Sequence, residues 1–124
     1  MVKLTKSEEE IMLIVWKMGG GFVKEILESC PDPKPHYNTV STLIKLLQDK
    51  GFVGYEAFGK TYRYFPRIAK EKYSRETVNP ILKNYFNGSV SQLVSFFVKE
   101  KNISLAELET LVAECRNASK SNKN

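Results

Sequence analysis

The segment 38–53 constrains the fold of this chain more than any other. Its apolar side chains recur at i, i+3, i+4 and i+7, the spacing of a helix buried along one side, and they are Val40, Leu43, Ile44 and Leu47. Lys50 and Gly51 follow, and glycine predicts a helix end because it readily takes the left-handed conformation. The segment therefore predicts an amphipathic helix that stops just before Phe52.

The opposite side of this helix carries short polar and cationic side chains. At about 3.6 residues per turn, the residues that project away from the apolar stripe are Asn38, Ser41, Thr42 and Lys45. Side chains of this kind can enter the major groove of DNA and contact base edges and phosphates. We therefore interpret the helix as a recognition helix, with a merely solvated polar face as the alternative.

A β-hairpin is predicted directly after the helix, over residues 52–66. The alternating residues that begin at Val53 and the aromatic-rich run 62–65 predict its two strands. Gly59 supplies the turn and places Lys60 at its tip. Helix, glycine stop and hairpin form the core of a winged helix-turn-helix, in which Lys60 would lie near a phosphate. A solvated hairpin lysine is the alternative.

Two further helices are predicted before this segment. Thr5 and Glu8 have the spacing of a capping box, so the first helix is expected to begin at Thr5 and to end at the glycines 19–21. A shorter helix is expected over about 22–29. The prolines in 31–35 exclude a helix there, because proline lacks a backbone donor and restricts the residue before it. This segment is interpreted as the turn before the recognition helix.

Positive charge is concentrated around the predicted recognition helix. The whole chain has a net charge of +5 and a pI of about 9.2. Residues 1–33 carry four lysines against six acidic residues, for −2, whereas residues 34–63 carry four lysines and one arginine against two acidic residues, for +3. This distribution indicates a nucleic-acid partner, here double-stranded DNA.

The second half of the chain is predicted to be helical, with helices over about 69–87, over about 89–101 and from Ser104 onward. Pro80 should kink or restart the first of them. These helices carry more apolar surface than so short a region can bury alone, so a homodimer is expected, with packing against the first helix of the chain as the alternative. The candidate dimerisation residues are Phe86, Val90, Leu93, Val94, Phe97, Leu105, Leu108, Leu111 and Val112.

The expected fold class is mainly α with a small β-hairpin wing. We expect an N-terminal winged helix-turn-helix over residues 1–66 and a C-terminal helical dimerisation region over 67–117. The polar residues 118–124 are expected to form a disordered tail.

The sequence argues against an enzyme, a metal site and a membrane protein. It has no phosphate loop and no nucleophile beside a base, so neither catalysis nor a cofactor is expected. One histidine with two isolated cysteines does not make a zinc site. Cys30 and Cys115 are interpreted as free thiols, with a disulfide as the alternative. No signal peptide is recognised and no apolar run reaches the roughly 20 residues that span a bilayer, so a cytoplasmic location without membrane insertion is expected.

Two motifs surround the end of the recognition helix. They are Thr39-Val40-Ser41-Thr42-Leu43 with Leu47 and Lys50-Gly51-Phe52-Val53, and Gly59-Lys60-Thr61-Tyr62-Arg63-Tyr64 with Pro66. This pattern resembles the signature of the penicillinase-repressor family (BlaI/MecI/CopY type). The similarity continues through 88–98 and the last helix, and so covers nearly the whole chain.

The resemblance implies a repressor that binds an inverted-repeat operator through its winged helix and dimerises through its C-terminal helices. In the β-lactam-responsive members, a membrane sensor-protease pathway leads to cleavage within those helices, and the cut maps to Phe96 and Phe97 here. Phe96 replaces a frequent asparagine, and Leu46 replaces a usual arginine of the recognition helix. The cysteine-rich metal hook of the copper-responsive members is absent.

The candidate DNA-binding residues lie before, along and after the recognition helix, and are His36, Tyr37, Asn38, Thr39, Ser41, Thr42, Lys45, Lys60 and Arg63. Asn38 could pair with adenine or cap the helix, and we leave both roles open. His36 and Tyr37 could contact the DNA backbone or only pack in the loop. The alternative function is a winged helix that binds a protein, against which the polar helix face argues, because protein-binding faces are more apolar.

Overall fold

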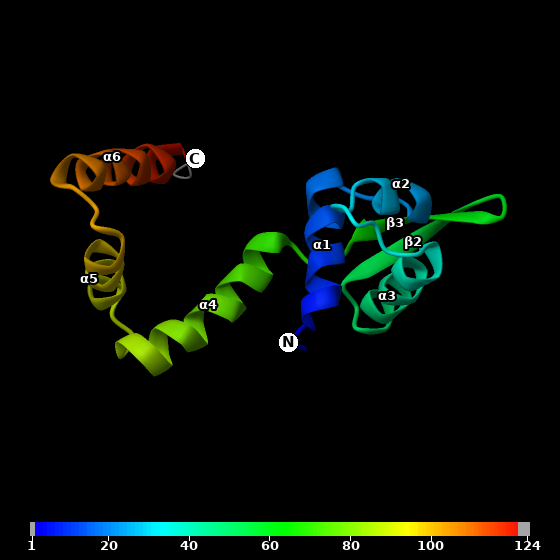
Figure 1. Ribbon diagram of the computed structural model, residues 1–124, viewed down its shortest axis with the longest axis horizontal. Coiled ribbons are helices and arrows are strands. Elements are labelled where there is room, and N and C mark those ends of the chain that lie inside the picture. Colours follow the sequence, from blue (N-terminus) through cyan, green and yellow to red (C-terminus); the bar gives the residue numbers. More distant parts are fainter. Residues whose placement is uncertain (1, 122–124) are drawn as a thin grey trace. The chain divides into compact units, whose positions relative to one another are not determined.

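The computed structural model describes residues 2–121, with side chains as far as Ala118. The chain divides into two compact units, Met1–Glu76 and Thr77–Asn124. The first unit holds the helices and strands of the expected winged helix-turn-helix, and the second holds the C-terminal helices (Figure 1).

The first unit packs three helices against a small antiparallel sheet. Its strand order is β1-β3-β2, and β2 with β3 forms a hairpin that extends past the helices (Figure 1). This architecture confirms the predicted fold class. In chain order the elements are α1 (Lys6–Met18), β1 (Gly21–Phe22), α2 (Val23–Glu28), α3 (Tyr37–Asp49), β2 (Val53–Phe58), β3 (Thr61–Pro66) and the first turns of α4 (Lys70–Phe86).

The ends of α1 follow the sequence prediction. The Thr5 hydroxyl accepts a hydrogen bond from the backbone N–H of Glu8, and a carboxylate oxygen of Glu8 accepts one from the N–H of Thr5. This reciprocal pair satisfies two donors that a helix start otherwise leaves free. Gly19, with φ of 77°, ends the helix in the left-handed conformation.

The short strand β1 corrects the prediction of a helix from residue 22. Phe22 pairs with Arg63 in β3, and Gly21 pairs with Tyr64, so α2 begins one residue later, at Val23. Gly20 makes this approach possible. Its φ is +130°, and a Cβ at this position would lie 2.7 Å from the carbonyl oxygen of Tyr64.

The apolar stripe of α3 lies in the core of the first unit. Val40, Ile44 and Leu47 are fully buried, and Leu43 packs against the same cluster at its edge. Burial of each such side chain contributes about 1.5–3 kcal/mol. The other buried apolar residues of this core are Leu4, Ile11, Met12, Val15, Val23, Ile26, Cys30, Phe52, Val53, Tyr64 and Tyr73.

The first unit reaches ten residues beyond the expected boundary at residue 66, because the start of α4 belongs to its core. Tyr73 is only 8% exposed, and its ring centroid lies 5.4 Å from that of Phe52 and 5.8 Å from that of Trp16. The indole N–H of Trp16 donates to the carbonyl oxygen of Ile68 at 2.8 Å. These contacts hold the first turns of α4 on the winged helix.

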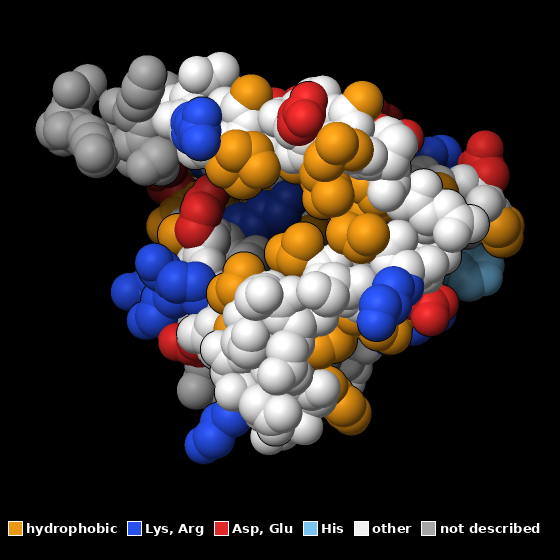
Figure 2. All heavy atoms as spheres, turned by 90° about the vertical axis from the view of Figure 1, so that its left-hand side faces the viewer, with side chains coloured by type: hydrophobic (Ala, Val, Ile, Leu, Met, Phe, Trp, Pro, Cys, Tyr) orange, Lys and Arg blue, Asp and Glu red, His pale blue; other side chains and the backbone are white. Residues whose placement is uncertain are grey.

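The second unit consists of the rest of α4, α5 (Val90–Lys101) and α6 (Leu105–Ser121). Pro80 lies inside α4 without dividing it, so of the two predicted outcomes, a kink or a restart, the restart does not occur. Among the described residues of this unit, no side chain is buried. Figure 2, which faces the side of α5 and α6, shows hydrophobic side chains spread over the surface.

The last helix is longer than the sequence predicts. Its backbone is helical through Ser121, which lies within the tail expected from residue 118, while 122–124 lie outside the described residues. Over the described part of the chain, none of the helices combines the length and the hydropathy needed to cross a bilayer.

Candidate nucleic-acid interface

The predicted recognition helix is α3, and it begins one residue before Asn38. His36 is the residue at its N-cap, with extended backbone, and Tyr37 is the first residue of α3. The N–H groups of Thr39 and Val40 both donate to the carbonyl oxygen of His36. The alternative role of Asn38 as the helix cap is therefore wrong, and its side chain is exposed in the first turn.

The solvent side of α3 presents the predicted polar residues in two rows. Tyr37, Ser41 and Lys45 follow one another at i, i+4 and i+8 and line a groove beside the helix. Asn38 and Thr42 form the neighbouring row and are exposed. Thr39 is also exposed. Leu46 is 42% exposed.

The groove lies between α3, the hairpin and the start of α2, and has a volume of about 530 Å³. It brings together segments that are distant in the sequence. Its lining residues are Phe22, Val23, Lys24, Glu25, Tyr37, Ser41, Lys45, Lys60, Thr61, Tyr62 and Tyr64.

Three tyrosines from the hairpin meet on the sheet face beside this groove. The ring centroids of Tyr55 and Tyr62 lie 5.0 Å apart, and both rings lie about 6.5 Å from that of Tyr64. Burial raises the pKa of the Tyr64 phenol, and the neighbouring Tyr62, Tyr37 and Tyr55 raise it further. Tyr64 therefore stays neutral at physiological pH, and it offers a hydroxyl group and a ring face to the wall of the groove.

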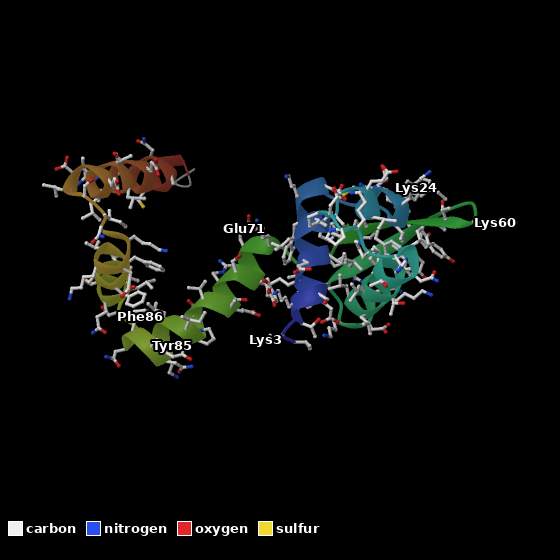
Figure 3. The ribbon with its side chains drawn as sticks, viewed as in Figure 1. Lys3, Lys24, Lys60, Glu71, Tyr85 and Phe86 are labelled. Carbon is white, nitrogen blue, oxygen red and sulfur yellow. The ribbon has the colours of Figure 1, made fainter. Side chains whose placement is uncertain are left out.

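The cations of the groove come from three different elements. Lys24 belongs to α2, Lys45 to α3 and Lys60 to the hairpin turn, where Figure 3 shows it at the tip. Glu25 is the one acidic residue of the lining, and its carboxylate accepts a hydrogen bond from the backbone N–H of Phe22 at 2.9 Å. Three lysines against one engaged carboxylate leave the groove cationic, as suits a polyanion.

Three of the basic residues counted near the predicted recognition helix, Lys34, Lys50 and Arg63, are not among the residues that line the groove. Arg63 alternates with Tyr62 and Tyr64 along β3, so it lies on the other face of the sheet. Its guanidinium lies beside Gly20, 3.0 Å from where a Cβ would stand. The ammonium of Lys34 donates to the carbonyl oxygens of Glu28 and Cys30, both at 2.8 Å, and so caps the end of α2.

Seven groove residues are not among the sequence-predicted set, and they are Phe22, Val23, Lys24, Glu25, Thr61, Tyr62 and Tyr64. Lys24 lies outside the recognition helix and the hairpin, and only the fold brings α2 beside them. Tyr62 is two residues from Tyr64, and this period-two spacing is the signal that could have placed both on one face of the strand.

The predicted dimerisation residues all lie in the helices of the second unit or at their ends. Phe86, Leu93 and Leu108 are half-buried, and the other six are exposed. The Phe96 ring contacts both Phe86 and Phe97, with centroids 5.5 Å and 5.6 Å apart. Phe96 and Phe97, the predicted cleavage site, lie in the middle of α5 and remain nearly half exposed.

The chain is similar to known proteins over most of its length. Residues 4–116 match the family model described as "Penicillinase repressor". The methicillin resistance regulatory protein MecI of Staphylococcus aureus (strain N315) is 26% identical over 110 residues, which cover 88% of this chain and 89% of that protein. The penicillinase repressor of Bacillus licheniformis is 24% identical over 114 residues, covering 88% and 86%.

A solved structure shares the fold of the first unit. The solution structure of the DNA-binding domain of the repressor BlaI superposes with a TM-score of 0.51 at 22% identity. The superposition covers 57% of this chain and 88% of that domain. The expected resemblance in sequence and fold is thereby confirmed.

Proposed function

Because this chain belongs to the penicillinase repressor family, we propose that it is a homodimeric DNA-binding transcriptional repressor that binds an inverted-repeat operator and leaves it on a signal. The observation that carries the proposal is the groove between α3, the hairpin and α2. It combines a polar helix face with lysines from three elements.

In the proposed complex, α3 enters the major groove and its first two turns meet base edges. Asn38 and Thr42 stand on the exposed row, where an amide and a hydroxyl can donate and accept hydrogen bonds. Lys45 and Lys60 flank the groove and would contact phosphates on either side. Phosphate contacts hold the helix in register, while the contacts of α3 with bases give sequence preference.

The second unit supports the dimer in the proposal, because it has exposed apolar side chains and no buried one among its described residues. Three short helices without a core are unstable as an isolated unit. A second copy would cover their apolar faces. A two-fold dimer would present two recognition helices to half-sites about 34–36 Å apart, or a multiple of that distance.

Release by cleavage at Phe96 and Phe97 requires α5 to unfold locally, because a protease binds its substrate in an extended conformation. Within a single copy α5 has no buried side chain, so this opening costs little there, whereas in the proposed dimer it would also cost the apolar contacts that the second copy covers. A chain that ends at Phe96 imitates the cleaved product. We expect it to be monomeric and to lose most of its operator affinity, and undiminished affinity would refute this mode of release.

The first experiment enriches duplexes from a random library with the purified full chain, then measures their binding by fluorescence anisotropy against a scrambled duplex in a salt series. We expect preference for an inverted repeat, two copies of the chain per duplex and steep salt dependence. Lys45→Ala should lower the salt slope by about 0.9 for each phosphate that is no longer neutralised, and Glu10→Ala should not. Equal, weak binding to both duplexes would favour a winged helix that serves a protein partner.

The dimer is tested separately by sedimentation velocity. Val94→Asp places a charge on the apolar face of α5, where the side chain is 45% exposed and a folded monomer tolerates it. We expect this variant to sediment as a monomer at concentrations where the wild type is a dimer. Ser95→Asp, on the adjacent exposed position, is the control. A dimer that survives Val94→Asp would contradict the proposed interface.

A further inference from the structure

Glu8 is the one charged residue that the described part of the chain buries, with 2% of its surface exposed. It lies in the first turn of α1, far in the sequence from every candidate DNA-binding residue. Its carboxylate accepts two hydrogen bonds, one from the N–H of Thr5 at 2.8 Å and one from the ammonium of Lys50 at 2.6 Å. Lys50 keeps 25% of its side chain exposed, so the pair is sealed only on the Glu8 side.

Lys50 is the C-cap of the recognition helix, and its N–H donates to the carbonyl oxygen of Leu46. The chain then leaves α3 through Gly51 and enters the hairpin. The N–H of Phe52 returns to the carbonyl oxygen of Leu47 at 2.9 Å, and the N–H of Arg67 donates to the carbonyl oxygen of Phe52 at 2.8 Å. The Glu8–Lys50 pair therefore lies at the corner from which both candidate DNA-binding elements, α3 and the hairpin, diverge.

A buried ion pair is weak support for stability, because desolvation of the charges offsets most of their attraction. It does restrict geometry, since the short bond tolerates little displacement of either partner once one charge is removed from water. A shift of Lys50 would change the direction of α3 relative to α1 and to the hairpin. A small change in the direction of α3 weakens its contacts with base edges more than its contacts with phosphates.

We propose that Glu8 is a positioning residue for sequence-specific DNA recognition, which acts through Lys50 by fixing the corner between α3 and the hairpin. The inference rests on the proposed DNA-binding function. It assigns a recognition role to an acidic side chain that cannot itself contact DNA.

For the preferred sequence, the proposal predicts a change in DNA affinity opposite in sign to the change that net charge alone predicts. Removing a carboxylate makes the protein more positive and should strengthen its binding to any DNA. A positioning role instead predicts that loss of the Glu8 charge weakens binding to the preferred sequence while binding to other DNA stays equal or rises. The ratio of the two affinities separates these outcomes.

The test compares Glu8→Gln with Glu10→Gln, which removes the same charge at an exposed position of the same helix. Both full-length variants are titrated by anisotropy with the enriched duplex and with the scrambled one. For Glu8→Gln we expect a roughly tenfold loss on the enriched duplex, the size of a typical coupling between contacting residues, and no loss on the scrambled one. Glu10→Gln should keep the wild-type ratio.

An unchanged ratio in Glu8→Gln would overturn the proposal, as would an equal loss in Glu10→Gln. If Glu8→Gln does not fold, as judged by circular dichroism, Lys50→Met takes its place, because it removes the bond from the other side. It should reduce the ratio without lowering the salt slope, and a lower slope would make Lys50 a phosphate contact and refute the positioning role. Absence of sequence preference in the wild type would instead refute the proposed function.

Discussion

Truncation of Tyr73 to alanine should remove a large part of the stability of the winged helix, although this residue lies outside the segment that the sequence assigns to it. The Tyr73 side chain is 8% exposed and packs edge-to-face against Phe52 and at a tilt against Trp16. Its hydroxyl also accepts a hydrogen bond from the backbone N–H of Leu4 at 3.2 Å. Tyr73→Ala removes the ring and the acceptor, whereas Tyr73→Phe removes the acceptor alone.

The expected magnitudes follow from these contacts. Replacing a buried aromatic ring by alanine costs about 3–5 kcal/mol, because the cavity that remains collapses only in part. Loss of the hydroxyl leaves the buried N–H of Leu4 without its acceptor and costs about 1–2 kcal/mol. The whole domain is expected to have about 5–15 kcal/mol of stability. Tyr73→Ala is therefore expected to be marginally folded, and Tyr73→Phe to remain folded.

Urea unfolding of the full chain at one fixed protein concentration measures both values. Trp16 is the single tryptophan, so its fluorescence reports the unfolding of the first unit. Substitution of the neighbouring Tyr73 also changes the environment of the indole, so far-UV circular dichroism provides a second, independent measure of the transition. Lys72→Ala, on the exposed side of the same turn, is the control and should change the free energy of unfolding by less than about 0.5 kcal/mol. A loss below about 1 kcal/mol for Tyr73→Ala would show that α4 is not part of the domain core.

Three further predictions concern recognition, backbone geometry and pH. Asn38→Ala should reduce discrimination at one base pair by about 1–3 kcal/mol, measured on single-substituted duplexes, and equal losses on random DNA would contradict this role. Gly20→Ala should destabilise the first unit clearly more than Gly51→Ala in urea, because both need positive φ but only Gly20 lies against backbone, the Tyr64 carbonyl. Burial raises the pKa of Glu8, but the bonds from Lys50 and Thr5 outweigh it and hold the pKa below its ordinary 4.5. The contribution of Glu8 to the free energy of unfolding should therefore be complete above pH 4.5 and be lost as the pH falls through the lower folded-state pKa. Urea unfolding at a series of pH values should show a shallower loss in Glu8→Gln than in the wild type.

The sequence predicts those parts of the fold that local pattern determines. The stripe of α3 is read from a period of 3.6, and the capping box of α1 from a spacing of three, because both depend on neighbours within one turn of helix. The hairpin is predicted for the same reason, since its strands and turn are contiguous.

The remaining features depend on contacts between distant segments. β1 has two residues and exists only because β3, about forty residues later, pairs with it. Lys24 lines the groove because α2 packs beside α3 and the hairpin, and Arg63 lies on the opposite face of the sheet because of the register of β3. Neither placement follows from a periodic pattern in the local sequence. The first compact unit extends to Glu76, and the buried ring of Tyr73 packs the start of α4 against its core.

The coreless second unit has a consequence for gene control if the proposed dimer forms. A unit that is stable only when paired makes the concentration of the chain part of its folding equilibrium. At low copy number most chains would carry a folded winged helix that binds a single half-site weakly. Occupancy of the operator would then rise more steeply than in proportion to the amount of protein, so dilution by growth or a modest loss of chains would switch the regulated promoter sharply.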